Sequence, residues 1–165
     1  MTPEPPQDEV DAIVDAWRRE RPDVDTTPMQ VLSRLTRLAR HLDRTRRAAF
    51  AEQRLEPWEF DVLSALRRSG PPYQLSPGRL VTETMVTSGT MTNRVDRLAA
   101  RGLVAREPDP ADRRGVLVTL TTSGRDVVDA ALDALLVRER ALLAALTDDE
   151  SAGLAAALRT LARHV

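Results

Sequence analysis

The 165-residue chain contains no cysteine and only two histidines, His41 and His164. Without thiols it cannot form disulfides, thiolate metal sites or a cysteine-based redox sensor. The two histidines lie far apart in the sequence, and the spacings typical of metal ligands or of a Gly-rich phosphate loop are missing. No nucleophile has a plausible base near it in the sequence. We therefore expect a protein that is not an enzyme and that carries no metal and no cofactor.

Long apolar runs are also missing, since no segment approaches the roughly 20 apolar residues of a membrane span. The first residues, Met1–Asp8, are rich in proline and acidic. A signal peptide would instead begin with basic residues and continue with apolar ones. These features predict a cytoplasmic protein without a membrane partner.

Lysine is absent, so all 24 basic residues are arginine, and 25 acidic residues balance them. This bias is typical of a GC-rich genome, although arginine is also the better bidentate partner for phosphate and guanine. The formal net charge of -1 leaves no global basic excess. Any surface for nucleic acid must therefore be a local patch opposed by acidic regions elsewhere.

Both ends of the chain show helical periodicity. Apolar residues recur there at spacings of three and four, which predicts amphipathic helices. These helices are expected over Asp8–Glu20, from Thr27 to about Gln53, from Thr121 through Leu143, and from a capping box at Thr147 onward. A single monomer of this length offers too little core to cover the long apolar helices, so we expect them to need a partner chain.

The middle of the chain has the length pattern of a helix-turn-helix. A helix is expected from Pro57 to the breakers at Ser69–Pro72. Two short helices follow, over Ser76–Thr82 and Thr87–Arg101, with only a few residues between them. Gly102 is expected to close the second of these helices.

Two strands are expected directly after Gly102, over Leu103–Arg106 and Val116–Leu120. The polar segment Pro108–Gly115 would form the tip of the resulting hairpin. The predicted fold class is mainly α with a small β-hairpin wing, a winged helix-turn-helix flanked by N- and C-terminal helices.

Short polar side chains crowd the start of the segment Thr87–Arg101. Met91, Val95 and Leu98 share one face of this helix, which leaves the opposite face free to contact bases and phosphates. Arginines at the wing tip suit the negative potential of the minor groove. We expect DNA contacts from Ser88, Thr90, Thr92, Asn93, Arg97, Arg113 and Arg114.

Each of these residues also has a purely structural interpretation. Serine and threonine commonly cap helix N-termini. The wing-tip arginines could belong to an ordinary solvated turn in which Asp112 pairs with one of them. The six arginines against four acids between Arg94 and Arg114 nevertheless form a modest basic excess, which favours phosphate contact.

The segment Asp112–Thr121, DRRGVLVTLT, resembles the wing signature of the MarR family of bacterial regulators, an Asp, an Arg two residues on, then Val-x-Leu-Thr. The order of elements from about residue 28 to the end is similar as well. The resemblance implies a homodimer that binds a palindromic operator in double-stranded DNA. Residues 8–55 and 121–165 would form its helical dimerisation region, and residues 57–120 the DNA-binding region of a single domain.

The additional helix within Val10–Asp23 resembles the urate-responsive, PecS-like branch of this family. That resemblance implies a ligand site, and the matching positions are Trp17, Asp61, Arg94 and Arg106. The expected ligand is a small anionic aromatic compound such as urate or a phenolic molecule. Its charge would pair with Arg94 and repel Asp61, which would move the recognition helix and release the DNA.

The ligand residues have other interpretations too. Trp17 could anchor a core, Asp61 could be an ordinary surface residue, and Arg94 could contact DNA directly. A winged helix can also serve as an architectural or protein-interaction module, for which no ligand effect is expected. Repression is the expected outcome of operator binding, with activation as the alternative.

Overall fold

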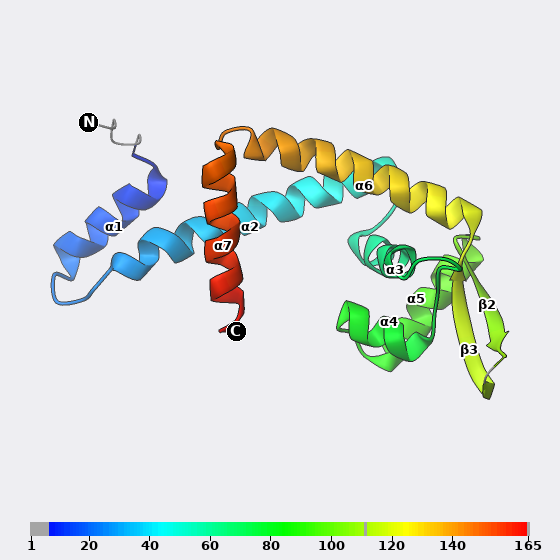
Figure 1. Cartoon of the computed structure of the whole chain (residues 1–165). Coiled ribbons are helices and arrows are strands. Elements are labelled where there is room, and N and C mark those ends of the chain that lie inside the picture. The colour runs from blue at the N-terminus through cyan, green and yellow to red at the C-terminus, as the bar shows by residue number, and fades with distance from the viewer. Residues whose placement is uncertain (1–6, 111, 165) are drawn as a thin grey trace. The chain divides into compact units, whose positions relative to one another are not determined.

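The computed structural model describes residues 7–110 and 112–164, with the backbone alone at residues 113 and 114. Helices dominate, and a small antiparallel sheet is formed by one strand after the third helix and a hairpin after the fifth, which confirms the predicted fold class (Figure 1). In chain order the elements are α1 (Glu9–Glu20), α2 (Thr27–Glu52), α3 (Pro57–Arg68), β1 (Gln74–Leu75), α4 (Pro77–Thr84), α5 (Ser88–Ala100), β2 (Val104–Asp109), β3 (Asp112–Leu120), α6 (Thr122–Leu143) and α7 (Asp148–Ala162).

The chain divides into two compact units, one up to Thr45 and one from Arg46 onward. The first unit contains α1 and most of α2. The second contains the end of α2 and every later element. Each unit is described by itself below.

The first unit begins with a capped helix at the predicted position. Asp8 is the N-cap of α1, and its carboxylate accepts hydrogen bonds from the backbone N–H groups of Val10 and Asp11. Val10 and Val14 are buried, whereas Trp17 on the same helix is 49% exposed. The apolar periodicity therefore predicted the helix correctly, but the indole is not enclosed by this chain.

Ion pairs hold α1 to the start of α2 within the first unit. Arg34 of α2 lies 2.8 Å from a carboxylate oxygen of Asp8 and 2.8 Å from one of Asp11, and Arg37 pairs with Glu9. The Arg34 guanidinium lowers the pKa of Asp8. The pKa of Asp11 is lowered by a hydrogen bond from the Asp8 backbone N–H and by Arg34.

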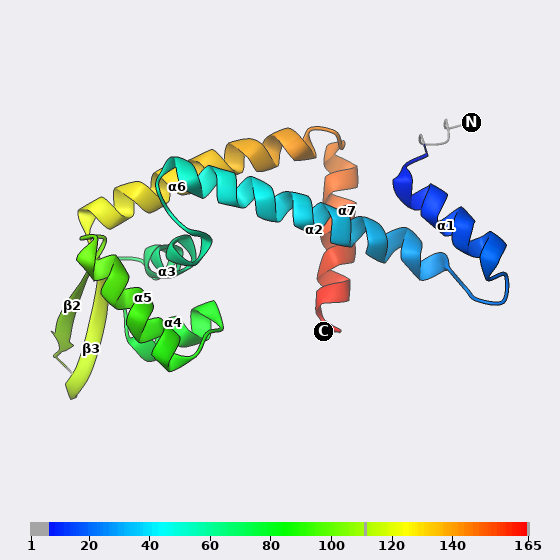
Figure 2. The same cartoon turned by 180° about the vertical axis from the view of Figure 1, so that it is seen from behind.

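The core of the second unit forms around α3. Phe50, near the end of α2, stacks on Phe60 of α3 with ring centroids 4.1 Å apart. In both views α4 and α5 lie with α3 beside the β2–β3 hairpin (Figures 1 and 2). Buried apolar side chains from every element of this unit except β1 and α7 join the cluster, among them Leu63, Leu66, Leu80, Met91, Val95, Leu98, Val118, Val128, Ala131 and Leu135.

Several predicted helix ends are caps in the structure. Ser76, Thr87 and Thr121 are the N-caps of α4, α5 and α6, and each side chain accepts a hydrogen bond from a backbone N–H in the first turn. Thr147 and Glu150 form the predicted capping box of α7. These short polar residues satisfy donors that the first turn of a helix leaves free.

The helix expected over Ser76–Thr82 extends two residues further and ends at Thr84. Met85, in the left-handed conformation with φ +52°, terminates it. A left-handed methionine is uncommon, and no sequence signal of the kind that Gly102 supplies marks this stop.

The sheet corrects the predicted wing in two ways. Strand β1 was not predicted, because two residues are too few to show alternation; it pairs with β3, and the strand order is β1-β3-β2. Strands β2 and β3 reach into the segment Pro108–Gly115 that was expected to be the tip, so Arg113 and Arg114 belong to β3. A two-stranded ribbon projecting into solvent needs no apolar face, so its strands can be as polar as a loop.

The start of α6 is locked onto the start of β2. The Thr121 hydroxyl donates to the carbonyls of Gly102 and Leu103, at 2.8 Å and 3.0 Å, and accepts from the backbone N–H of Gly124. A Cβ at position 124 would lie only 2.0 Å from the Leu103 carbonyl oxygen. Only glycine permits this approach of helix to strand.

We predict that Gly124→Ala lowers the free energy of unfolding by about 1–3 kcal/mol, because the backbone of α6 or β2 must shift. The control is Gly89→Ala, where an added Cβ meets no heavy atom within 4 Å. Alanine in a helix is favoured over glycine by roughly 0.5–1 kcal/mol, so this variant should be as stable as the wild type or more so. Urea titration followed by circular dichroism measures both. Equal stability of the two variants would contradict the proposed close approach.

We predict that Arg34→Ala loosens α1, because both N-terminal carboxylates lose their partner. Protection factors of α1 amides, measured by hydrogen exchange, should fall several-fold while those of α3 and α5 stay unchanged. Arg18→Ala is the control, since Arg18 pairs with Asp15 on α1 itself, at 3.1 Å.

The same ion pairs predict a pH dependence. Because the pKa values of Asp8 and Asp11 are lowered in the folded chain, the stabilisation is complete above the ordinary carboxylate pKa of about 3.9 and is lost as the pH falls through the lowered values. Protection of α1 in the wild type should fall there, and protection in Arg34→Ala should change less. Parallel acid profiles would refute the assignment.

Candidate DNA interface and ligand-site residues

Helix α5 has the two faces that the sequence predicted. Met91, Val95 and Leu98 are buried at 0%, 1% and 0% exposure. The opposite side carries exposed polar residues, and these include all five predicted contact residues of the helix, Ser88, Thr90, Thr92, Asn93 and Arg97. A polar face of this kind, backed by a buried apolar one, is suited to lie in a DNA groove.

Some hydroxyl groups on this face also serve the helix itself. The Thr87 and Thr90 hydroxyls lie 2.9 Å apart, and the Thr92 hydroxyl donates to the Ser88 carbonyl at 3.2 Å. The structural interpretation of these threonines, as residues that cap the helix or bond to its backbone, is therefore correct. Each hydroxyl oxygen is nevertheless exposed at the surface and can still accept a hydrogen bond from DNA.

Contacts from β2 hold one flank of α5. The Arg106 guanidinium lies 2.7 Å from a carboxylate oxygen of Asp96 and donates to the Thr92 carbonyl at 3.3 Å. Arg106 was predicted as a ligand residue, and in the structure it connects the base of the wing to α5, the recognition helix of the helix-turn-helix.

Contacts from α3 hold the other flank. The Arg97 guanidinium lies 3.5 Å from a carboxylate oxygen of Glu56 and 4.7 Å from the centroid of the Trp58 ring. The Arg94 guanidinium lies 5.4 Å from the same centroid. Since residues 94 and 97 lie on the side of the helix opposite residues 92 and 96, α5 is clamped between α3 and the wing.

A buried carboxylate completes the connection between α3 and α5. Glu59 is only 2% exposed, and it accepts from the Arg101 side chain at 2.6 Å and from the Glu56 backbone N–H at 2.9 Å. Arg101 also donates to the Arg54 carbonyl at 2.9 Å. Sequence reasoning missed Glu59; the Glu-x-x-Glu spacing around Pro57 is the capping-box signal that could have indicated it.

The four predicted ligand residues do not all lie in one unit. Trp17 belongs to the first unit, whereas Asp61, Arg94 and Arg106 belong to the second. Asp61 is exposed on α3, and the ion pairs found among the described residues do not include one from Asp61 to an arginine. The aromatic partner of Arg94 is Trp58, which the sequence analysis did not single out.

The predicted wing residues are located by backbone alone. Arg113 and Arg114 lie near the start of β3, and their side chains are outside the described part of the chain. The pairing of β2 with β3 shifts between Pro108 and Asp109, so the ribbon is irregular close to these two arginines.

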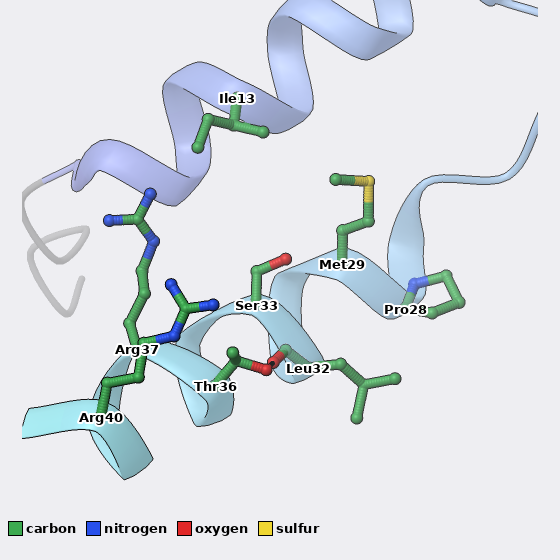
Figure 3. A pocket seen from close by; sticks show the side chains of 8 residues that line it. All are labelled: Ile13, Pro28, Met29, Leu32, Ser33, Thr36, Arg37 and Arg40. Atoms are coloured by element: carbon green, nitrogen blue, oxygen red, sulfur yellow. Dashed lines mark hydrogen bonds between the residues drawn. The ribbon is translucent and has the colours of Figure 1, made fainter. Parts of the chain in front are cut away.

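The first unit contains a hollow of about 440 Å³ between α1 and α2. In Figure 3, Ile13 points from α1 toward Ser33 and Met29 of α2. Arg37 and Arg40 also line it, and Arg37 already pairs with Glu9. None of the four predicted ligand residues lines this hollow.

Two kinds of site are not found in the described residues. No helix there is long and apolar enough to cross a membrane. No group of three or more histidine, aspartate or glutamate side chains in the same residues is placed to hold a metal ion.

Comparison with known proteins agrees with this geometry. A family model described as "MarR family" matches residues 55–115, from α3 to the wing. The chain is 37% identical over 157 residues to the HTH-type transcriptional regulator PecS of Dickeya dadantii (strain 3937), covering 95% of either chain.

Solved structures of related proteins share the fold. A mutant of MarR from E. coli complexed with operator DNA has a TM-score of 0.68 and 29% identity, and the match covers 84% of this chain and 99% of that one. BpsR of Bordetella bronchiseptica, whose DNA binding is described as regulated by 6-hydroxynicotinic acid, has a TM-score of 0.60 and 31% identity, covering 78% and 98%.

These matches confirm the predicted winged helix, and the matched proteins regulate transcription rather than catalyse a reaction, as the sequence predicted. Because the chain is 37% identical to PecS over nearly the whole of both proteins, it belongs to the MarR family of DNA-binding transcriptional regulators.

Proposed function

We propose that this protein is a homodimeric repressor that binds a palindromic operator and is released from it by a small anionic aromatic ligand. The observation that carries the proposal is the exposed polar face of α5, held outward by three buried side chains. A dimer seated on a promoter excludes polymerase, so release by ligand would restore transcription. Since the target is chromosomal DNA, we place the protein in the cytoplasm.

The DNA contacts divide between α5 and the wing. The α5 face would enter the major groove, where short polar side chains let the backbone approach the bases. The wing would place a guanidinium in the adjacent minor groove. The proposed contact residues are Ser88, Thr90, Thr92, Asn93, Arg97, Arg113 and Arg114.

Exposed apolar surface supports the dimer. Helix α7 contains no buried residue, and Leu154, Leu158 and Leu161 on it are 40%, 38% and 46% exposed. Leu132 and Leu136 of α6 are exposed as well. An isolated helix of 15 residues is marginal in water, so α7 needs a covering surface, which a second copy would supply. We assign residues 8–55 and 121–165 to this dimerisation region and 57–120 to DNA binding.

The ligand proposal rests on the guanidinium groups that flank α5. Arg94 and Arg106 are each engaged with a protein partner, Trp58 and Asp96, at the helix whose position decides DNA binding. An anion that pairs with either guanidinium would compete with its contact and so couple binding to helix position. Asp61 and Trp17 remain the other two ligand residues that the resemblance implies. BpsR, which 6-hydroxynicotinic acid regulates, provides an anionic heteroaromatic precedent among similar structures.

The alternative is a ligand-independent winged-helix module, architectural or protein-binding. It predicts binding with a steep salt dependence and little operator preference, whereas a repressor retains a large specificity ratio. Titration of operator and unrelated DNA at two salt concentrations distinguishes the two functions.

We predict that the double variant Arg113→Ala, Arg114→Ala loses operator affinity by at least about tenfold, because two guanidinium groups near phosphates are removed. Arg68→Ala is the control, since Arg68 lies on α3 and pairs with Glu83. Gel shift with the upstream intergenic DNA gives the affinity, and sedimentation shows that the dimer is intact. Unchanged affinity of the double variant would exclude the wing contact.

We predict that urate, salicylate or 6-hydroxynicotinate dissociates the operator complex, and that Trp17→Ala weakens this response more than it weakens DNA binding. Trp17→Phe is the matched control, because it keeps an aromatic ring on α1. Competition in the gel shift measures both quantities. Equal losses of ligand response and DNA affinity in Trp17→Ala would make Trp17 a structural residue.

A further inference from the structure

Four side chains connect the start of α3 to the recognition helix, and we call them the Trp58 cluster: Glu56, Trp58, Arg94 and Arg97. Two guanidinium groups of α5 lie within 6 Å of one indole ring, at 5.4 Å and 4.7 Å from its centroid. The indole N–H donates to Glu56, which also pairs with Arg97. Both arginines therefore meet α3 through the same small platform.

The platform lies at the capped start of α3, which packs against the core. Pro57 opens α3, and Glu56 and Glu59 form a capping box around it. Trp58 is half-buried and packs against the hydrophobic core. The arginines, in contrast, are long and partly exposed side chains on α5. The indole can therefore act as a fixed reference against which the recognition helix is oriented.

We propose that Trp58 is a positioning residue for DNA recognition and the aromatic wall on which the ligand displaces Arg94. This inference rests on the proposed function for the ligand and adds a residue that the resemblance to known regulators did not supply. In the free protein, cation–π contacts orient α5 through Arg94 and Arg97.

The chemistry explains why an aromatic anion fits this place. Its carboxylate or enolate oxygen pairs with the Arg94 guanidinium, an interaction stronger than a cation–π contact. Its ring takes the place of the guanidinium against the indole, so the apolar face of Trp58 stays covered. A non-aromatic anion supplies only the first of these contacts, and an uncharged aromatic compound only the second.

The positioning role is tested by operator affinity in the absence of ligand. Trp58→Leu keeps an apolar side chain against the core and removes the ring, and we expect it to bind operator about tenfold more weakly. Trp58→Phe retains a ring and should stay within about threefold of the wild type. Urea titrations should show both variants folded at the assay temperature. Wild-type affinity in Trp58→Leu, or equal losses in both variants, would overturn the positioning role.

The ligand contact is tested by ¹⁹F NMR. The chain has two tryptophans, Trp17 and Trp58, so Trp17→Phe protein labelled with 5-fluorotryptophan gives a single resonance from Trp58. We expect urate, salicylate or 6-hydroxynicotinate to move this resonance over the concentration range that releases DNA. In the double variant Trp17→Phe, Arg94→Ala, the resonance of Trp58 should be shifted before ligand is present, and the ligand should no longer move it.

The outcomes separate this proposal from the proposed function. DNA release without any movement of the Trp58 resonance would show that the ligand binds elsewhere. It would contradict the proposal that Trp58 is the aromatic wall of the ligand site. If none of the three compounds releases the wild-type complex from DNA, the proposed response to these anions is wrong. The proposed role of Trp58 as a wall for them is then wrong as well. The affinities of Trp58→Leu and Trp58→Phe then still decide the positioning role by themselves.

Discussion

Burial of Met91, Val95 and Leu98 is the constraint on which the rest of the DNA-binding unit depends. These three side chains commit one face of α5 to the core and thereby turn every polar residue of the opposite face toward solvent. Fully burying a side chain of this size is worth roughly 1.5–3 kcal/mol, more than the surface hydrogen bonds around it. The short hydroxyl-bearing residues are consequently exposed as a group.

Hydrophobic burial decides which face of α5 is buried, but because it is non-directional it does not fix the exact orientation of the helix. Directional contacts on the two flanks supply that information. On one side Arg106 pairs with Asp96. On the other side Trp58 contacts Arg94 and Arg97, and the buried Glu59 pairs with Arg101 at the C-cap of the helix. These contacts are mostly exposed, and an exposed ion pair contributes little free energy by itself.

The same contacts reduce the positive charge that this protein of net charge -1 can present to DNA. Arg97, Arg101 and Arg106 are each paired with a carboxylate of the same unit. The basic excess counted in the sequence is therefore partly neutralised within the fold. Affinity must come from a few well-placed groups, because a broad positive field is missing, and this favours a specific operator over general attraction to nucleic acid.

The features of the fold that depend on local sequence pattern could be predicted from the sequence. Apolar spacing and capping residues such as Thr121 and Thr147 indicated all seven described helices to within about two residues, because capping is decided within one turn. The two faces of α5 followed from periodicity alone. The ends of the wing strands and the two-residue strand β1 could not be predicted from periodicity. A solvated ribbon has no alternation of apolar and polar residues, and two residues are too few to show a period.

What the sequence determined by itself is the order of elements, the helix faces and the polar character of the recognition helix, because these depend on residues a few positions apart. Only the tertiary structure could bring Trp58 to Arg94, Glu59 to Arg101 and Arg106 to Asp96. The first two pairs are separated by about forty residues and join α3 to α5, and nothing in local periodicity specifies which side chains meet when two helices pack.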